Sequence, residues 1–183
     1  MSKVALMVAD GLEEIEGLTV ADICRRAGLE IDLVSNTDSL DIMSSHQIAF
    51  KADKAFHQTD LSEYDCIVLP GGMKGHKNLE ANSELQTAIR NFVAEGKYVA
   101  AICAAPTILG RMGILKGRTA TCYPGMEDAL EGATLGTHSV EVDGTVITSR
   151  GMGTTIDFAL KIVEIFMGAQ TAERIGHQIV YLQ

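Results

Sequence analysis

The feature that most constrains this sequence is the regular alternation of short apolar runs with segments of helical periodicity. Buried strands are expected where an apolar run is short and bounded by polar residues or glycine, at 4–9, 31–34, 66–69 and 98–102. Apolar residues recur with helical spacing between and after these runs, at 20–27, 85–92, 104–112 and 154–167, and in a last helix that carries Ile175, Ile179 and Leu182. This alternation predicts an α/β fold, with a doubly wound, mostly parallel sheet and helices on both faces.

Turn and capping residues indicate where some of these elements begin and end. Asn82 can cap the helix that follows it, and the Asp143-Gly144 pair between two apolar stretches predicts a small hairpin. Residues 36–47 are polar and weakly patterned, so we expect a loop or another small hairpin there. No linker, repeat or low-complexity tract interrupts the chain, and residues 1–183 are therefore expected to form a single domain.

Charge and hydropathy disfavour several classes of function. The chain has 15 basic and 24 acidic residues and a formal net charge of −9, which argues against nonspecific binding of nucleic acid. No stretch reaches about 18 uninterrupted apolar residues, so no membrane span is expected. The first apolar run is short and is followed by acidic residues, unlike an export signal, and a cytoplasmic location is therefore expected.

The four cysteines are candidates for chemistry, but their spacing limits what they can do. Cys24, Cys66, Cys103 and Cys122 are far apart and form no Cys-x-x-Cys pair, so the sequence predicts no metal site and no thioredoxin-like motif. In the cytoplasm these residues are expected to be reduced thiols. Cys24 and Cys66 lie on apolar stripes and are expected to be part of the core.

Chemistry-bearing residues gather directly after three predicted strands, where sheets of this kind bind ligands: they occupy 10–16, 70–75 and 102–106. In the third group, Cys103 stands between a strand and a helix and is flanked by small residues. This pattern is typical of a nucleophile elbow, a sharp, strained turn that exposes a reactive side chain. The positive end of the following helix would favour the thiolate. Alternatively, Cys103 is a small buried hydrophobic residue.

The other two groups also allow a functional and a structural interpretation. Gly71 and Gly72 either let backbone N–H groups approach a ligand or a developing oxyanion, or they form an ordinary glycine turn. Their segment lacks the Gly-Lys-Ser/Thr ending of a phosphate-binding loop. Glu13, Glu14 and Glu16 either complement a helix dipole, or one of them, for which Glu16 is the candidate, points into the crevice.

Four motifs, in order along nearly the whole chain, resemble the ThiJ/PfpI superfamily and, within it, the DJ-one branch. They are G-x-E-E-x-E after the first strand, V-L-P-G-G, A-A-I-C-A-A-P and S-R-G-M-G-T. The resemblance implies a flavodoxin-like fold and a homodimer. It also implies that Cys103 is the reactive cysteine, that Glu16 holds a protonated carboxyl against its sulfur, and that the backbone of Gly72 and Ala104 supports an oxyanion.

Two departures from the family pattern bear on the mechanism. Peptidase-type members carry histidine directly after the cysteine, and Ala104 at that position disfavours a peptidase. Tyr123 stands where the DJ-one branch often has histidine, and a phenol with an ordinary pKa of about 10 is a poor base at neutral pH. Tyr123, Gly71 and Arg150 are expected to surround the reacting pair, and Met152 replaces a proline in the last motif.

Three functions remain open at this point. The first is a cofactor-independent enzyme of glyoxalase or protein deglycase type, in which Cys103 attacks a small aldehyde or dicarbonyl and Glu16 moves the proton. The second is a redox sensor or chaperone-like stress protein without enzymatic activity, in which Cys103 is oxidised and Cys122 could act as a resolving thiol. The third is a cysteine hydrolase that borrows a base from a second subunit, with His46 or His76 as the candidates.

Overall fold

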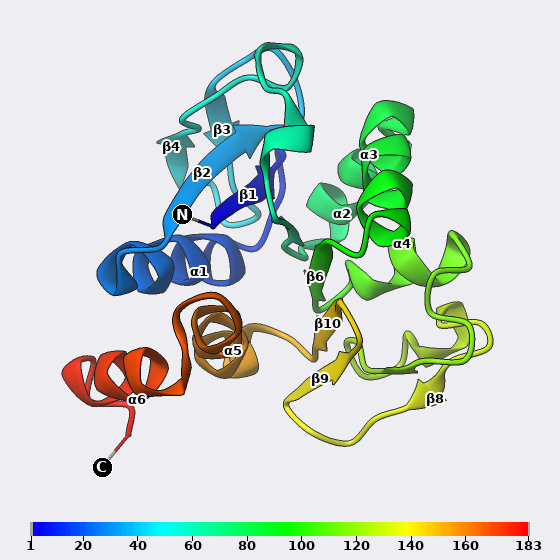
Figure 1. The fold of residues 1–183 in the computed structure, drawn as a ribbon. Coiled ribbons are helices and arrows are strands. Elements are labelled where there is room, and N and C mark those ends of the chain that lie inside the picture. Colours follow the sequence, from blue (N-terminus) through cyan, green and yellow to red (C-terminus); the bar gives the residue numbers. More distant parts are fainter. Residues whose placement is uncertain (1, 183) are drawn as a thin grey trace.

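The computed structural model describes residues 2–182 and has a central sheet of six strands (Figure 1). In spatial order these strands are β2 (Glu30–Ser35), β1 (Lys3–Val8), β5 (Cys66–Leu69), β6 (Tyr98–Ile102), β10 (Val146–Ser149) and β9 (Val140–Asp143). Neighbouring strands are parallel from β2 to β10, and β9 is antiparallel to β10. The predicted doubly wound, mostly parallel sheet is therefore confirmed, and the predicted hairpin at Asp143-Gly144 forms one edge of it.

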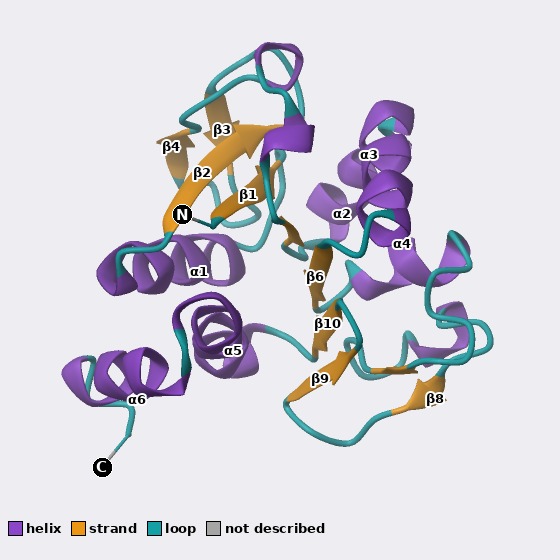
Figure 2. Cartoon of the chain, viewed as in Figure 1, coloured by secondary structure: helices purple, strands orange, loops and turns teal. Residues whose placement is uncertain are grey.

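Helices cover both faces of this sheet (Figures 1 and 2). One face carries α1 (Glu14–Ala27), α5 (Thr155–Met167) and α6 (Ala169–Gln178), and the other carries α2 (Met73–Ala81), α3 (Ser83–Ala94) and α4 (Pro106–Arg111). Along β1, Val4, Leu6 and Val8 belong to the core on the α1 side, whereas Ala5 and Met7 belong to the core on the α3 side. Because both faces are buried, the strand has a continuous apolar run.

Smaller elements surround the sheet. Strands β3 (Asp41–Met43) and β4 (Ala49–Lys51) form a hairpin, one of the two structures expected for the polar segment 36–47. Strand β7 (Thr119–Ala120) pairs with β8 (Thr134–Leu135). Short 3₁₀ helices occupy Phe56–Gln58, Leu61–Glu63, Glu127–Ala129 and Met152–Thr154. Among the helices between residues 2 and 182, none is both long and apolar enough to cross a lipid bilayer.

Three helices differ from the sequence predictions. The helix expected over 104–112 begins at Pro106, because Cys103 adopts a left-handed backbone conformation and the chain completes a turn before the helix starts. Helix α2 was not predicted, because its segment has few apolar residues. The last helix ends at Gln178, and Val180 at a φ of 59° turns the chain away, so Leu182 lies beyond the helix.

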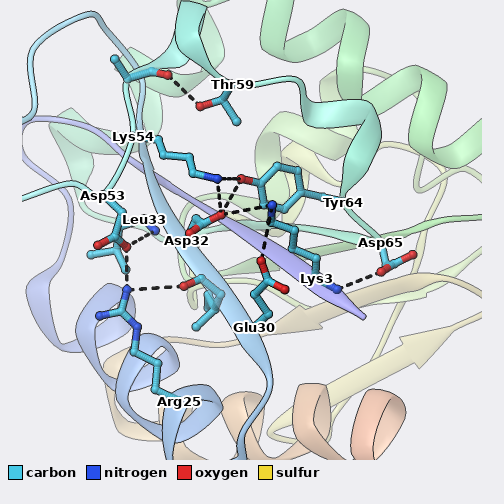
Figure 3. A network of polar contacts seen from close by, with 12 residues as sticks. Lys3, Arg25, Glu30, Asp32, Leu33, Asp53, Lys54, Thr59, Tyr64 and Asp65 are labelled. Carbon is cyan, nitrogen blue, oxygen red and sulfur yellow. Dashed lines mark hydrogen bonds and ion pairs between the residues drawn. The ribbon is translucent and has the colours of Figure 1, made fainter. Parts of the chain in front are cut away.

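A polar network ties β1, β2 and the start of β5 together at the amino-terminal ends of the strands (Figure 3). Oδ2 of Asp32 accepts hydrogen bonds from Nζ of Lys54 at 2.8 Å and from the hydroxyl of Tyr64 at 2.7 Å. The backbone N–H of Lys3 donates to Asp65 at 2.8 Å. Burial, together with the Asp32 carboxylate, raises the pKa of Tyr64 to about 12. These contacts fasten the sheet at the end opposite the loops discussed next.

Candidate active site

The loops that follow β1, β5, β6 and β10 meet at one edge of the sheet, because these strands are parallel neighbours. The chain passes from β1 to β2 on one side and continues with β5 on the other side, so this edge contains the topological switch point where α/β sheets bind ligands. Cys103 follows β6, Gly71 and Gly72 follow β5, Glu16 lies in the first turn of α1, and Gly151 follows β10. The three groups that the sequence singled out thus lie together.

Cys103 occupies a strained turn between β6 and α4. Its φ of 66° lies in the left-handed region, which non-glycine residues rarely adopt, as the elbow interpretation predicted. Its backbone N–H donates to the carbonyl of Ser149 at 3.0 Å, and its carbonyl accepts from the N–H of Tyr123 at 2.8 Å. These two bonds hold the turn between β10 and the loop that contains Tyr123, with the cysteine side chain half-buried.

Glu16 reaches the cysteine from the first turn of α1 and is almost completely buried, with 1% of its surface exposed. Its Oε2 accepts a hydrogen bond from the backbone N–H of Gly71 at 2.9 Å, and the carboxyl lies close enough to Cys103 for the two groups to shift each other's pKa. Oε1 has no hydrogen-bond partner among residues 2–182. Burial raises the pKa of Glu16 to about 7, and the nearby charge of Glu13 adds to this effect.

The two glycines after β5 allow the carboxyl and the thiol to meet. A Cβ atom at Gly71 would lie 2.6 Å from Oε2 of Glu16 and 2.7 Å from Cβ of Cys103, so no side chain fits there. Gly72 has a φ of 93°, and a Cβ atom there would lie 2.4 Å from the carbonyl oxygen of Gly11. This close approach brings the N–H of Gly72 near the sulfur, and the N–H groups of Gly72 and Ala104 both act to lower the pKa of the Cys103 thiol.

The electrostatics of Cys103 differ from the expectation of a resting thiolate. Burial raises the pKa of its thiol to about 12, and the charge and hydrogen bond of Glu16 act in the same direction. The N–H groups of Ala104 and Gly72 oppose these effects without cancelling them. While Glu16 is ionised, the prediction that Cys103 is a thiolate at rest is therefore wrong. Burial of the thiol outweighs the dipole of α4, which has six residues and starts only at Pro106.

Cys103 and Glu16 therefore form a pair of ionisable groups whose protonation is coupled. The carboxyl of Glu16 changes its protonation near pH 7, and the thiol of Cys103 keeps its proton well above that pH. When Glu16 takes up a proton, its negative charge no longer opposes ionisation of the sulfur, and its O–H can donate to the thiolate. Transfer of the thiol proton to Glu16 is thus the step that would generate the nucleophile.

Of the residues expected around this pair, Tyr123 lies next to the thiol, whereas Arg150 acts on another cysteine. Tyr123 lies beside the thiol: a Cβ atom at Gly151 would be 3.5 Å from the Tyr123 ring and 4.0 Å from Sγ of Cys103. The Tyr123 side chain is 51% exposed. Arg150 is exposed, and its charge acts to lower the pKa of the Cys122 thiol. Burial and the charge of Glu127 outweigh this effect and raise that pKa to about 11.

The remaining cysteines are buried. Cys24 and Cys66 belong to the core, as expected, and burial raises the pKa of Cys24 to about 12. Cys122 is 2% exposed, and its S–H donates to the carbonyl of Tyr123 at 3.4 Å. The structure records all four cysteines, including Cys103, as free thiols.

Two histidines have specific partners that the sequence did not suggest. His76, one of the candidate bases for a second subunit, is 2% exposed in α2, and its Nδ1 lies 3.0 Å from the carbonyl oxygen of Gly72. His46 pairs with Glu14, with Nδ1 2.8 Å from Oε1. Within residues 2–182, the ligand atoms of Glu13, Glu14 and His46 converge closely enough to hold a metal ion, although the spacing of the cysteines predicted no metal site.

Comparisons with known proteins agree with this architecture. "Protein dj-1beta" of Drosophila melanogaster is 35% identical over 179 residues, with 96% of each chain covered. "Protein DJ-1 homolog B" of Arabidopsis thaliana is 34% identical over 180 residues, but the chain spans only 41% of that protein's length. "Deglycase PH1704" of Pyrococcus horikoshii is 31% identical over 150 residues, covering 81% of this chain and 89% of the relative.

The fold is also similar to solved structures. "Toxoplasma gondii DJ-1, oxidized" superposes with a TM-score of 0.92 and 34% sequence identity over the full length of both chains. The family model described as "DJ-1/PfpI family" matches residues 2–165, which include the segments after β1, β5, β6 and β10. This chain belongs to the DJ-1/PfpI family.

Proposed function

We propose that this protein is a cofactor-independent, cysteine-dependent enzyme of glyoxalase or protein deglycase type that acts on reactive dicarbonyls. The observation that carries the proposal is the buried carboxyl of Glu16, held by the N–H of Gly71 beside the thiol of Cys103, which occupies a strained turn. A carboxyl with a pKa of about 7 is suited to moving protons at neutral pH. A nucleophile with a base in hydrogen-bond reach can support covalent catalysis.

In the first step, Sγ of Cys103 attacks the aldehyde carbon of a compound such as methylglyoxal. The carboxylate of Glu16 takes the thiol proton, and the new carbon–sulfur bond leaves a negative charge on the former carbonyl oxygen. Glu16 passes the proton on to this oxygen, which gives a hemithioacetal and restores the carboxylate. The N–H groups of Gly72 and Ala104, which lie against the sulfur, are placed to stabilise the developing oxyanion.

In the second step, a proton moves from the former aldehyde carbon to the neighbouring ketone carbon through an enediol, with Glu16 as the carrier. The first carbon is oxidised to a thioester and the second is reduced to an alcohol, so no external oxidant or reductant is consumed. Water then hydrolyses the thioester, which releases lactate and restores the thiol of Cys103. The sum is methylglyoxal plus water giving lactate.

The relative named a deglycase supports a closely related reaction. An early adduct between methylglyoxal and an amine is a hemiaminal, in which the former aldehyde carbon carries both a hydroxyl and the amine. Attack by Sγ of Cys103 on that carbon would expel the amine, which leaves with the thiol proton relayed by Glu16. The product is the same hemithioacetal, so both activities depend on one first intermediate and serve defence against carbonyl stress.

The test is formation of lactate from methylglyoxal by the purified protein without added glutathione or metal. We expect turnover by the wild-type protein, loss in Cys103→Ser and retention in Cys122→Ser, which removes a buried thiol one residue from Tyr123. Circular dichroism of each variant checks that the fold is retained. Turnover that survives Cys103→Ser would refute the proposal.

A redox sensor is the second candidate, and the oxidised state named for the Toxoplasma gondii neighbour favours it. A protonated Glu16 could donate a hydrogen bond to a sulfinate formed on Cys103 and so limit further oxidation. Mass spectrometry after mild peroxide treatment should then find two added oxygen atoms on Cys103. Oxidation of Cys24 or Cys66 before Cys103 would contradict this candidate, since both are buried.

A hydrolase or peptidase has less support. Ala104 leaves no histidine after the nucleophile, and His76 is buried against Gly72 rather than available to a second subunit. His46 is exposed but pairs with Glu14.

We further propose that the protein is a cytoplasmic homodimer. Apolar side chains remain exposed on α1 and on the adjoining β3–β4 hairpin, where Ile15, Leu18, Met43 and Ile48 are 36–49% exposed. The hairpin adjoins α1, because the N–H of Ser45 donates to the carbonyl of Leu12 at 2.8 Å. Light scattering during size-exclusion chromatography should give twice the 19.6 kDa of the chain, and a monomeric mass would contradict the proposal.

A further inference from the structure

Beside the thiol site, a second cluster of ionisable side chains joins the start of α1 to the turn between β3 and β4. Glu13 and Glu14 come from the helix start, and Ser45 and His46 come from the turn. The ligand atoms of Glu13, Glu14 and His46 all lie within 4.8 Å of one another. Nδ1 of His46 is 2.8 Å from Oε1 of Glu14 and 3.8 Å from Oε1 of Glu13.

The acceptor atoms of this cluster outnumber the side-chain protons at its centre. The hydroxyl of Ser45 lies 3.3 Å from Oε2 of Glu13, 3.1 Å from Oε2 of Glu14 and 3.1 Å from Nδ1 of His46, but it carries one proton. Burial opposes the charge of Glu14, yet hydrogen bonds from its own N–H, Ser45 and Ser44 and the charge of His46 lower its pKa. The two carboxylates therefore present concentrated negative charge to one imidazole.

Backbone contacts fix the two segments before any ligand arrives. The N–H of Ser45 donates to the carbonyl of Leu12 at 2.8 Å, and the N–H of Gly11 donates to the carbonyl of Met43 at 2.7 Å. The N–H of Glu13 donates to the carbonyl of Gly71 at 3.1 Å. The carboxylates are largely buried, with side-chain exposures of 17% for Glu13 and 9% for Glu14, whereas the His46 side chain is 67% exposed. The cluster is thus preorganised, and in the single chain its imidazole faces solvent.

We propose that Glu13, Glu14 and His46 bind a divalent transition metal ion, for which Zn²⁺ is the probe. An imidazole nitrogen with two carboxylate oxygens is a typical zinc ligand set, and water can fill the fourth position from the exposed side. Tetrahedral ligand atoms at bond lengths of about 2.1 Å lie about 3.4 Å apart, and the two distances from Nδ1, 2.8 Å and 3.8 Å, bracket this value. The metal would replace the proton between His46 and Glu14, and it shares no ligand with the thiol pair.

The test is calorimetric titration of Zn²⁺ into metal-free, full-length protein carrying Cys103→Ser, because a free thiol could bind zinc by itself. We expect one Zn²⁺ per chain. Adding His46→Ala or Glu14→Gln should lower the affinity at least about tenfold, since even loss of an outer-sphere partner has that effect. His138→Ala is the matched control, because His138 is also exposed but pairs with the single carboxylate of Glu141 at 2.9 Å.

His46→Arg separates a metal site from a simple ion pair. Arginine keeps a positive partner for both carboxylates but offers no metal ligand. We expect Zn²⁺ to raise the melting temperature of the parent and to leave that of His46→Arg unchanged. The absence of saturable binding in the parent, or equal affinity in His46→Ala and the parent, would overturn the proposal.

Discussion

The buried carboxyl of Glu16 makes a prediction about stability that does not depend on any substrate. Because the fold raises its pKa from 4.5 to about 7, the native state binds this proton more tightly than the unfolded chain does. Stability is therefore lost as the pH rises through about 7. A tenfold change in an acid dissociation constant corresponds to about 1.4 kcal/mol, so the raised pKa lowers the free energy of unfolding, relative to acid pH, by about 1 kcal/mol at pH 5 and about 3 kcal/mol at pH 8.

Glu16→Gln removes this cost and keeps an oxygen to accept the N–H of Gly71. We expect the free energy of unfolding in urea, under reducing conditions, to be higher for the variant than for the wild-type protein. This difference should be about 2 kcal/mol larger at pH 8 than at pH 5. Glu14→Gln is the matched control two residues away: the fold lowers the pKa of Glu14, so this variant should lose stability, and lose more at the higher pH. A Glu16→Gln protein whose gain is the same at both pH values would refute the electrostatic reasoning.

Further predictions concern the turn, a helix cap and the residue beside the thiol. Gly71→Ala would place a methyl group 2.7 Å from Cβ of Cys103. We expect this variant to lose lactate formation and its free energy of unfolding in urea to fall by about 2 kcal/mol. Gly153→Ala, whose added Cβ would have no neighbour within 4 Å, should leave both close to the wild-type values. Asn82→Ala removes the acceptor of two N–H groups at the start of α3 and should cost about 1 kcal/mol, and an unchanged melting temperature would argue against the cap. Tyr123→His should increase turnover of methylglyoxal near neutral pH, because an imidazole is the better base at this exposed position, and an unchanged rate would show that no second base is needed.

Much of the fold was predictable because the apolar pattern directly reflects burial. The strands at 66–69 and 98–102 match β5 and β6, and Asn82 caps α3 as its residue type suggested. Helix α2 was missed because tertiary packing rather than apolar periodicity explains it. A Cβ atom at Gly75 would lie 2.6 Å from Cα of Leu12, so this helix depends on a close approach to the loop after β1 that no local pattern indicates.

The candidate site was predictable in its residues but not in its electrostatics. The motifs placed Cys103 and Glu16 after β6 and β1, and parallel pairing of the strands explains why they meet. The direction of the thiol pKa depends on burial and on the distance to a buried charge, which a sequence does not contain. The cluster around His46 was missed for a related reason, because Glu14 and His46 lie 32 positions apart in the sequence, and the hairpin brings them together.

The central claim is that Glu16 takes the proton of Cys103 when the thiol attacks its substrate. The most direct measurement is the pH dependence of kcat/KM for lactate formation from methylglyoxal, in the wild-type protein and in Glu16→Gln. The account predicts a wild-type rate that rises with pH through a midpoint of about 7 and the loss of this rise in Glu16→Gln. A wild-type rate that falls across this range, or a Glu16→Gln protein with the wild-type profile, would contradict it.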